Sequence, residues 1–376
     1  MVAFQMARHL AEKDHEVTVV TSDHNLSDTR FDTGTFETIY LSCISRWGFY
    51  LTPGLVSWAR SQVPRFDLVH MHTLRTFQNA VVGYYARKNN IPYVISAHGT
   101  LPVIVERMTA KRLYDRLAGQ KLLDGAACLV AVSPFEARQY RGVGIEEERI
   151  RVIYNGLDLE EFKNLPPRGT FRQRLGIPAE TPIILFLGRL HRRKGIDHLV
   201  QAFAQIRCQL NGAKLLIVGP DGGEERVLRN LVDQLELDGS VLFTGPLYGQ
   251  DKLAAYVDAD VLASPAIHEI FGLVPFEALM CGTPVVVTDD CGSGQIIGEA
   301  EAGYIVPYGD IGAIKSALVH ALSHEDDVLD RTEAGITFVR ESLDQETSYQ
   351  NLENTYTELL GNSSHGLQNI VSTGPI

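Results

Sequence analysis

Two glutamates that enclose a Phe-Gly-Leu tripeptide are the residues best suited to chemistry in this chain. Glu269 and Glu277 flank Phe271, Gly272 and Leu273, and the residues after Glu277 have the pattern of a helix. A glycine at a helix start lets backbone N–H groups approach an anion, and the helix dipole adds to the attraction. Either glutamate alone would be interpreted as a capping or solvent-facing acid. Together they predict a diphosphate seat, with two carboxylates that address different hydroxyls of one extended ligand.

A basic turn follows one of the predicted strands. Gly188, Arg189 and Lys194 belong to the run Gly-Arg-Leu-His-Arg-Arg-Lys-Gly, directly after an apolar stretch. Guanidinium and ammonium groups suit phosphate oxygens. A charge run is usually a solvated loop, but the flanking glycines and the position after a strand favour a phosphate clamp formed by Arg189 and Lys194. We interpret Arg192 and Arg193 as surface charge.

A histidine, His98, ends another apolar stretch, within Ser-Ala-His-Gly-Thr. An isolated histidine is more often a structural residue than a catalytic one. Because ligands bind at the carboxyl ends of strands in open α/β sheets, its position makes His98 a candidate for ligand binding.

These residues follow short apolar runs that alternate with helical periodicity. The expected strands are 17–21, 67–71, 92–97, 128–132 and 151–154 in the first half, and 183–187, 215–218, 241–244, 261–263 and 284–288 in the second. Runs of this kind are typical of parallel sheets covered by helices on both faces. The sequence therefore predicts an α/β protein with two doubly wound, Rossmann-like domains that face each other across a cleft.

The chain is divided by a segment rich in proline and glycine. Residues 164–169 cannot continue either periodicity, so we expect an N-terminal domain over 1–165 and a C-terminal domain over 166–345. The chain opens in an amphipathic helix, whereas such a domain normally begins with a strand and a glycine-rich turn. The N-terminal domain is thus expected to lack both. Residues 363–376 are expected to form a loose tail.

Composition excludes several classes of protein. The formal net charge is −12, and the acidic residues lie mostly in the second half, which argues against nucleic acid as a partner. No window reaches the roughly 18 apolar residues of a membrane helix, and no signal peptide is recognised, so a cytoplasmic location is expected. The five cysteines have no metal-binding spacing. A dehydrogenase is excluded because no strand is followed by G-x-G-x-x-G.

The motifs together resemble those of the retaining glycosyltransferases of family 4. The resemblance rests on Glu269-x7-Glu277 with its Phe-Gly-Leu, the following Glu-Ala-Leu-Met-Cys-Gly-Thr-Pro, Gly188-Arg189-Leu190, Lys194-Gly195, Ala97-His98-Gly99-Thr100, Ala131-Val132-Ser133 and Asn155-Gly156-Leu157-Asp158. It covers the chain from Val2 to about Leu360. Each motif alone is weak, but their order and spacing are specific.

The resemblance implies a GT-B fold, with a C-terminal helix over 346–362 that packs back on the N-terminal domain. It implies that Arg189 and Lys194 bind the donor diphosphate and stabilise the leaving group, next to Gly188. Backbone amides of Phe271, Gly272 and Leu273 would hold the donor. Glu277 would bind the ribose, Glu269 the transferred sugar, and His98 would contact that sugar from the other domain.

The implied reaction is transfer of a hexose-type sugar from a UDP- or GDP-linked donor to a glycan or lipid-linked acceptor, in polysaccharide or glycolipid synthesis. The anomeric configuration would be retained, and neither a metal nor another cofactor is expected. The tripeptide Asp258-Ala-Asp260 resembles a metal-binding Asp-x-Asp, but it lies on the approach to a strand. We interpret it as structural.

Two alternatives stay open, and one surface prediction is added. The chain would be an inactive, donor-binding protein if its N-terminal strand and loop are truncated, or a nucleotide-sugar epimerase on a related fold. A basic stretch over 107–121, with apolar residues interleaved, suggests peripheral contact with the anionic inner face of the cell membrane. An ordinary solvated helix face explains the same pattern.

Overall fold

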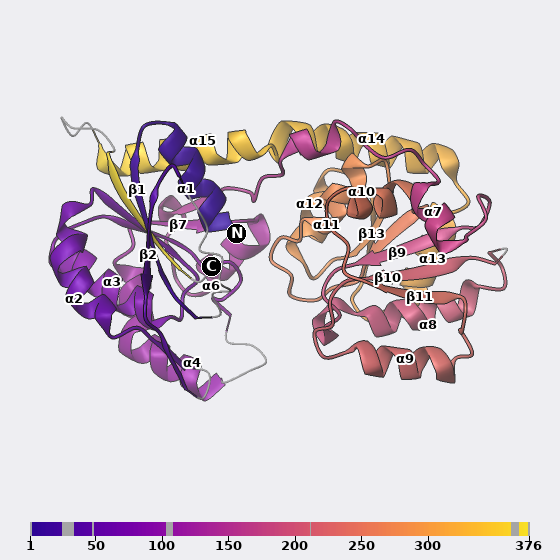
Figure 1. Cartoon of the computed structure of the whole chain (residues 1–376), viewed down its shortest axis with the longest axis horizontal. Helices are drawn as coiled ribbons and strands as arrows, with labels where there is room; N and C mark the ends of the chain where they lie inside the picture. The colour runs from indigo at the N-terminus through magenta and orange to yellow at the C-terminus, as the bar shows by residue number, and fades with distance from the viewer. Residues whose placement is uncertain are drawn as a thin grey trace. The chain divides into compact units, whose positions relative to one another are not determined.

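The computed structural model describes residues 2–24, 34–46, 49–102, 108–210, 212–361 and 368–374. The chain forms two compact units. The N-terminal unit contains Met1–Asn155 and Glu346–Ile376, and the C-terminal unit contains Gly156–Gln345. Each unit is an α/β domain with one parallel sheet, as the sequence predicts (Figure 1).

The N-terminal unit is built on a seven-stranded sheet in the order β2-β1-β15-β5-β6-β7-β8. Its strands are β1 (Glu16–Ser22), β2 (Glu37–Leu41), β5 (Leu68–His72), β6 (Tyr93–Ser96), β7 (Cys128–Ala131), β8 (Ile150–Val152) and β15 (Asn369–Thr373). All neighbouring strands run parallel. A separate antiparallel pair is formed by β3 (Ile44–Arg46) and β4 (Phe49–Leu51).

Helices cover both faces of this sheet. On one face, α1 (Val2–Glu12) and α15 (Gln345–Leu360) pack against the sheet around Ile370. On the other face lie α2 (Gly54–Gln62), α3 (Phe77–Lys88), α5 (Gln120–Asp124) and α6 (Pro134–Gly142), around Val371. Because successive side chains of a strand point to opposite faces, the adjacent Ile370 and Val371 serve both cores.

The central strand of the N-terminal unit corrects two expectations. Residues 369–373, expected in a loose tail, form β15 between β1 and β5, so the position of the strand thought to be missing is filled. Ile370 and Val371 are fully buried. Asp67 Oδ2 accepts hydrogen bonds from the backbone N–H groups of Gln368 and Asn369, at 3.1 and 2.8 Å. Pairing on both sides and burial on both faces hold these residues in place. The other expectation, that the N-terminal domain lacks a glycine-rich loop, is not tested by β15.

The C-terminal unit has a six-stranded sheet in the order β11-β10-β9-β12-β13-β14. Its strands are β9 (Ile183–Leu187), β10 (Lys214–Val218), β11 (Val241–Gly245), β12 (Val261–Ser264), β13 (Val285–Thr288) and β14 (Tyr304–Val306). One core joins β9 and β10 to α8 (Ile196–Ile206), α9 (Glu225–Gln234) and α13 (Ile311–Ala321). The helices α10 (Gly249–Asp258), α11 (Val274–Met280) and α12 (Gly292–Glu299) lie on the opposite side, and α14 (Glu325–Ser342) contacts α11.

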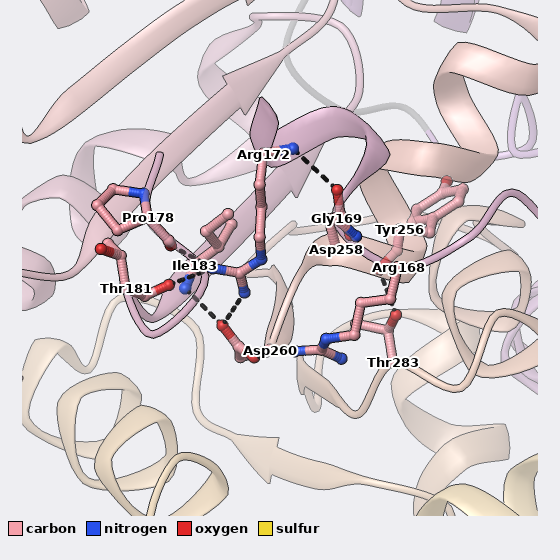
Figure 2. A network of polar contacts seen from close by, with 10 residues as sticks. All are labelled: Arg168, Gly169, Arg172, Pro178, Thr181, Ile183, Tyr256, Asp258, Asp260 and Thr283. Carbon is pink, nitrogen blue, oxygen red and sulfur yellow. Dashed lines mark hydrogen bonds and ion pairs between the residues drawn. The ribbon is translucent and has the colours of Figure 1, made fainter. Parts of the chain in front are cut away.

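The boundary between the units lies earlier in the chain than expected, because two carboxylates hold the proposed linker within the C-terminal unit (Figure 2). Asp258 accepts hydrogen bonds from the backbone N–H groups of Gly169, Phe171 and Arg172, the last at 2.9 Å, and so caps α7 (Thr170–Leu175). Asp260 binds the guanidinium groups of Arg168 and Arg172, at 2.5 and 2.7 Å. Segment 164–169 therefore belongs to the C-terminal unit.

Candidate functional site

The turn after β9 is fixed by close backbone contacts. Gly188 and Gly219 meet at the ends of β9 and β10, and a Cβ on Gly219 would overlap the carbonyl of Gly188. A Cβ on Gly222 would lie only 2.8 Å from Arg189 Cγ. Arg189 is exposed, and its guanidinium has no partner within the described part of the chain. The turn thus holds a cation at the edge of the sheet that is available to an anion.

Lys194 lies in a short 3-10 turn that ends at Gly195, whose φ is +63°. A Cβ on Gly195 would overlap the carbonyl of Pro265, so the turn docks against the segment after β12. There the Lys194 ammonium forms an ion pair with Glu269, and both side chains are only about a quarter exposed. The basic turn and the Glu269 segment, separate in the sequence, are therefore brought together.

The Phe271-Gly272-Leu273 segment connects Glu269 to α11. Gly272 has a φ of +75°, and a Cβ there would lie 3.2 Å from Glu269 Cγ. Phe271 is 4% exposed and its ring packs on Phe276 at 5.4 Å between centroids, so its side chain anchors this segment in the domain. No side chain caps α11 at Leu273.

Glu277, on α11, is held by two residues of α10 that the sequence interpretation did not find. The Tyr256 hydroxyl donates to Glu277 Oε2 at 2.7 Å, and Lys252 Nζ lies 3.1 Å from Glu277 Oε1. Burial, and then the negative charge of Glu277, raises the pKa of Tyr256 well above its ordinary value. The i, i+4 spacing of Lys252 and Tyr256 is the signal that could have identified them.

A second helix start lies beside Glu269 and was also missed. The backbone N–H of Gly292 donates to the Glu269 carbonyl at 2.7 Å, and Cys291 Sγ caps α12 by accepting from the N–H of Gly294 at 3.2 Å. A Cβ on Gly294 would overlap the carbonyl of Thr288. The Gly-Ser-Gly sequence over 292–294, separated by three residues from the end of β13, is the sequence signal for this close approach.

His98 belongs to the N-terminal unit and lies just after β6, in a left-handed conformation with φ of +47°. The N–H of Gly99 donates to buried Glu136 at 2.7 Å, which fixes the turn. His98 Nε2 lies 2.9 Å from His72 Nδ1. Burial lowers the pKa of His98 to about 4, so the ring is neutral near pH 7. The residues predicted to bind the sugar donor therefore gather at the carboxyl ends of the strands in the C-terminal unit. His98 lies at the carboxyl end of β6 in the N-terminal unit.

The predicted membrane surface is a helical segment formed by α4 (Met108–Tyr114), a π turn over Asp115–Gly119 and α5. Met108, Leu113 and Leu117 are exposed by 46, 58 and 65%. Arg107, the first residue of the predicted stretch, lies outside the described residues.

A cavity of about 360 Å³ lies next to this helical segment. Its lining includes Arg75, Leu101, Asp115 and Gln139. Arg75 forms two hydrogen bonds with Asp115, at 2.8 and 2.7 Å, and donates to Leu101 O at 2.8 Å. Its guanidinium is thus occupied by protein groups, and the cavity offers mainly apolar and neutral polar contacts.

The described residues contain neither a metal-binding cluster nor a membrane-spanning helix. No group of three or more His, Cys, Asp or Glu side chains there could hold a metal ion. None of the helices in those residues combines the length and apolarity needed to cross a membrane.

Comparisons with known proteins agree with this fold. The family model described as "Glycosyltransferase Family 4" matches residues 1–161, and "Glycosyl transferases group 1" matches residues 167–337. An uncharacterized glycosyltransferase of Methanocaldococcus jannaschii is 29% identical over 322 residues, covering 78% of this chain and 76% of that protein. D-inositol 3-phosphate glycosyltransferase of Corynebacterium urealyticum is 32% identical over 290 residues, covering 73% and 68%. The D-inositol 3-phosphate glycosyltransferase of Corynebacterium jeikeium is 31% identical over 270 residues, covering 68% of this chain and 64% of that protein.

Solved structures are similar along nearly the whole chain. Sucrose-phosphate synthase from Thermosynechococcus elongatus has a TM-score of 0.75 and 25% identity, covering 96% of this chain and 92% of that one. Anabaena HepE in complex with UDP-glucose has a TM-score of 0.73 and 20% identity, covering 91% and 99%. The fold and these comparisons define a glycosyltransferase with the GT-B fold. The chain belongs to glycosyltransferase family 4.

Proposed function

We propose that this protein transfers a hexose-type sugar from a UDP- or GDP-linked donor to a glycan or lipid-linked acceptor, with retention of the anomeric configuration and without a metal. The observation that carries the proposal is the basic turn after β9, where Arg189, which has no partner among the described residues, lies near the ion pair of Lys194 with Glu269. The solved complex of HepE with UDP-glucose supports a nucleotide-sugar donor for a protein of this fold.

The proposed chemistry is electrostatic stabilisation of the departing diphosphate. Arg189 would bind phosphate oxygens directly, because it has no protein partner within the described residues. Lys194 is held by its ion pair with Glu269, which supports a role in which this ammonium group meets the developing charge with little reorganisation. Glu269 keeps further acceptor positions for hydroxyls of the transferred sugar. No strong base is required by this scheme.

Glu277 would bind the ribose. Tyr256 and Lys252 each take one carboxylate oxygen, and an ionised carboxylate has about four acceptor positions. The remaining positions would accept hydrogen bonds from ribose hydroxyls. Because Tyr256 and Lys252 fix the carboxylate before the donor arrives, binding costs little side-chain entropy.

The donor and the stereochemistry can be tested together. Purified protein is incubated in EDTA with a panel of UDP- and GDP-sugars, and release of the nucleoside diphosphate and the anomeric configuration of the product are measured. The proposal predicts release from one donor with retained configuration. Inversion would contradict the retaining mechanism, and activity only after a divalent cation is added would contradict metal independence. Binding of a donor without transfer to any acceptor would favour the inactive alternative.

We also propose that the protein is cytoplasmic and binds peripherally to anionic membranes through 107–121. The exposed apolar side chains of Met108, Leu113 and Leu117 support this, next to basic residues of the same segment. Co-sedimentation with anionic vesicles at low salt is expected, and Leu113→Glu should abolish it while Leu329→Glu, at an exposed leucine of the C-terminal unit, should not. Failure of the parental protein to sediment would contradict the proposal.

A further inference from the structure

Three histidines lie next to one another at the carboxyl ends of β5 and β6. His70 and His72 share one face of β5, because side chains two apart in a strand point the same way. Their ring centroids are 4.3 Å apart, and those of His72 and His98 are 5.2 Å apart. His70 and His72 are 1% and 3% exposed. The resemblance pointed only to His98, so the other two histidines require an explanation.

His70 is fully used within the fold. Its Nδ1 lies 2.5 Å from the Tyr356 hydroxyl on α15, and its Nε2 lies 2.8 Å from Ser96 Oγ on β6. Burial, with the nearby His98 as a smaller cause, lowers the pKa of His70 to about 3. With both ring nitrogens occupied, His70 links α15 to the sheet and has no atom left for a ligand.

His72 is different because one of its ring nitrogens faces His98. The Nδ1 of His72 and the Nε2 of His98 are 2.9 Å apart, and the two rings are nearly coplanar, with 8° between their planes. Burial lowers the pKa of both histidines, so both rings are neutral near pH 7. A hydrogen bond between two neutral imidazoles needs one donor and one acceptor.

The surroundings of His72 decide which ring donates. Its Nε2 is buried without a partner among the residues the structure describes. If His98 donated, His72 would carry its proton on this Nε2, and a buried N–H without an acceptor is rarer and more costly than a buried acceptor without a donor. His72 Nδ1–H therefore donates to His98 Nε2. The proton of His98 then lies on Nδ1, on the side of the ring away from His72.

We propose that His72 is a positioning residue that fixes the tautomer and ring orientation of His98, so that His98 presents an Nδ1–H donor to a hydroxyl of the transferred sugar. This inference rests on the proposed function, in which His98 contacts that sugar. The backbone turn at His98 is fixed independently by Gly99 and Glu136. Without His72 the imidazole would therefore stay in place but lose its defined orientation and tautomer.

The test compares two substitutions of His72 in the full chain. His72→Asn supplies an amide N–H donor near the position of Nδ1. His72→Leu removes the donor and fills the space with an apolar side chain. For the leucine variant we expect a roughly tenfold or larger loss of kcat with little change in the donor KM, and for the asparagine variant a kcat within about threefold of the parental value. A merely structural role would not produce this rescue. In a His98→Ala background, His72→Leu should have no further effect.

A second measurement reads the tautomer directly. Imidazole ¹⁵N spectra of the parental protein, assigned by the loss of signals in His98→Ala, should show His98 protonated on Nδ1, with that signal shifting when donor is added. An Nε2-protonated His98, or a folded His72→Leu variant with parental kcat, would overturn the inference. If His72→Leu does not fold, the spectra decide. If the parental protein transfers no sugar, the proposed function fails, whereas the tautomer is still measured.

Discussion

The two sheets of this protein correspond over six strand positions, but the chain fills the central position of each sheet in a different way. In the C-terminal unit the central strand β9 comes first in the sequence, followed by its neighbours β10 and β12. In the N-terminal unit the central position, between β1 and β5, is taken by β15 from the far end of the chain. The comparison teaches that a position in a doubly wound sheet is defined by two parallel partners and two apolar faces, and that any segment meeting these conditions can fill it.

Removal of residues 368–376 should have the largest effect on stability, and it should affect the N-terminal unit but not the C-terminal unit. It deletes a strand with parallel partners on both sides and the fully buried Ile370 and Val371. We expect the N-terminal unit to lose cooperative unfolding while the C-terminal unit keeps its own transition, measured by calorimetry and limited proteolysis. A synthetic peptide of residues 366–376 should restore the lost transition. A truncated chain that melts like the parental protein would contradict the role of β15.

The next largest effect is a pH dependence of the free energy of unfolding. We expect it in the N-terminal unit, because the buried histidines lie there. The folded-state pKa values of His70 and His98 are lowered to about 3 and 4, so the unfolded state binds protons first as the pH falls. Their stabilising contribution is complete above about pH 6.5 and is lost progressively down to about pH 4, by up to ~1.4 kcal/mol per pH unit for each histidine.

Urea unfolding of the N-terminal unit between pH 7.5 and 4.5 checks this dependence. The slope should decrease by about one proton in His98→Asn, which removes one titrating ring. Equal stability of this unit at both ends of the range would show that the histidines are not held neutral by burial.

The smallest effect compares the two central strands directly. Ile370 in β15 and Ile184 in β9 are both fully buried, so they form a matched pair. Ile370→Val and Ile184→Val should each cost about 0.5–1.5 kcal/mol, each in its own unit, because both remove one core methylene group. Denaturant unfolding of the two variants measures this. A negligible cost for Ile370→Val alone would mean that β15 is held less tightly than β9.

Much of the fold could be predicted from sequence because β-branched runs of strand length are a local signal. The expected strand 183–187 is β9, and 284–288 differs from β13 by one residue. The strand β15 was missed because Asn369–Thr373 is short and lies among polar residues, and only its long-range partners reveal it. The unit boundary was misplaced because Asp258 and Asp260, far along the chain, hold the proline-containing segment.

The candidate site was predicted to the extent that its chemistry lies in local motifs. Arg189, Lys194 and Glu269 could be found by residue type, glycine spacing and position after a strand. Their supports could not, because Lys252 and Tyr256 reach Glu277 only once α10 packs against α11. His72 is a similar case, since its role depends on the pairing of β5 with β6.

The central claim, that the basic turn after β9 binds the donor diphosphate, is tested most directly by donor turnover in Arg189→Ala. Arg192→Ala, an exposed arginine three residues further along the same turn, is the matched control. Losing one preorganised partner of a developing charge costs about 3 kcal/mol, so Arg189→Ala should lose roughly a hundredfold or more in kcat/KM while Arg192→Ala keeps nearly parental activity. Parental turnover in a folded Arg189→Ala, or an equal loss in both variants, would contradict the assignment.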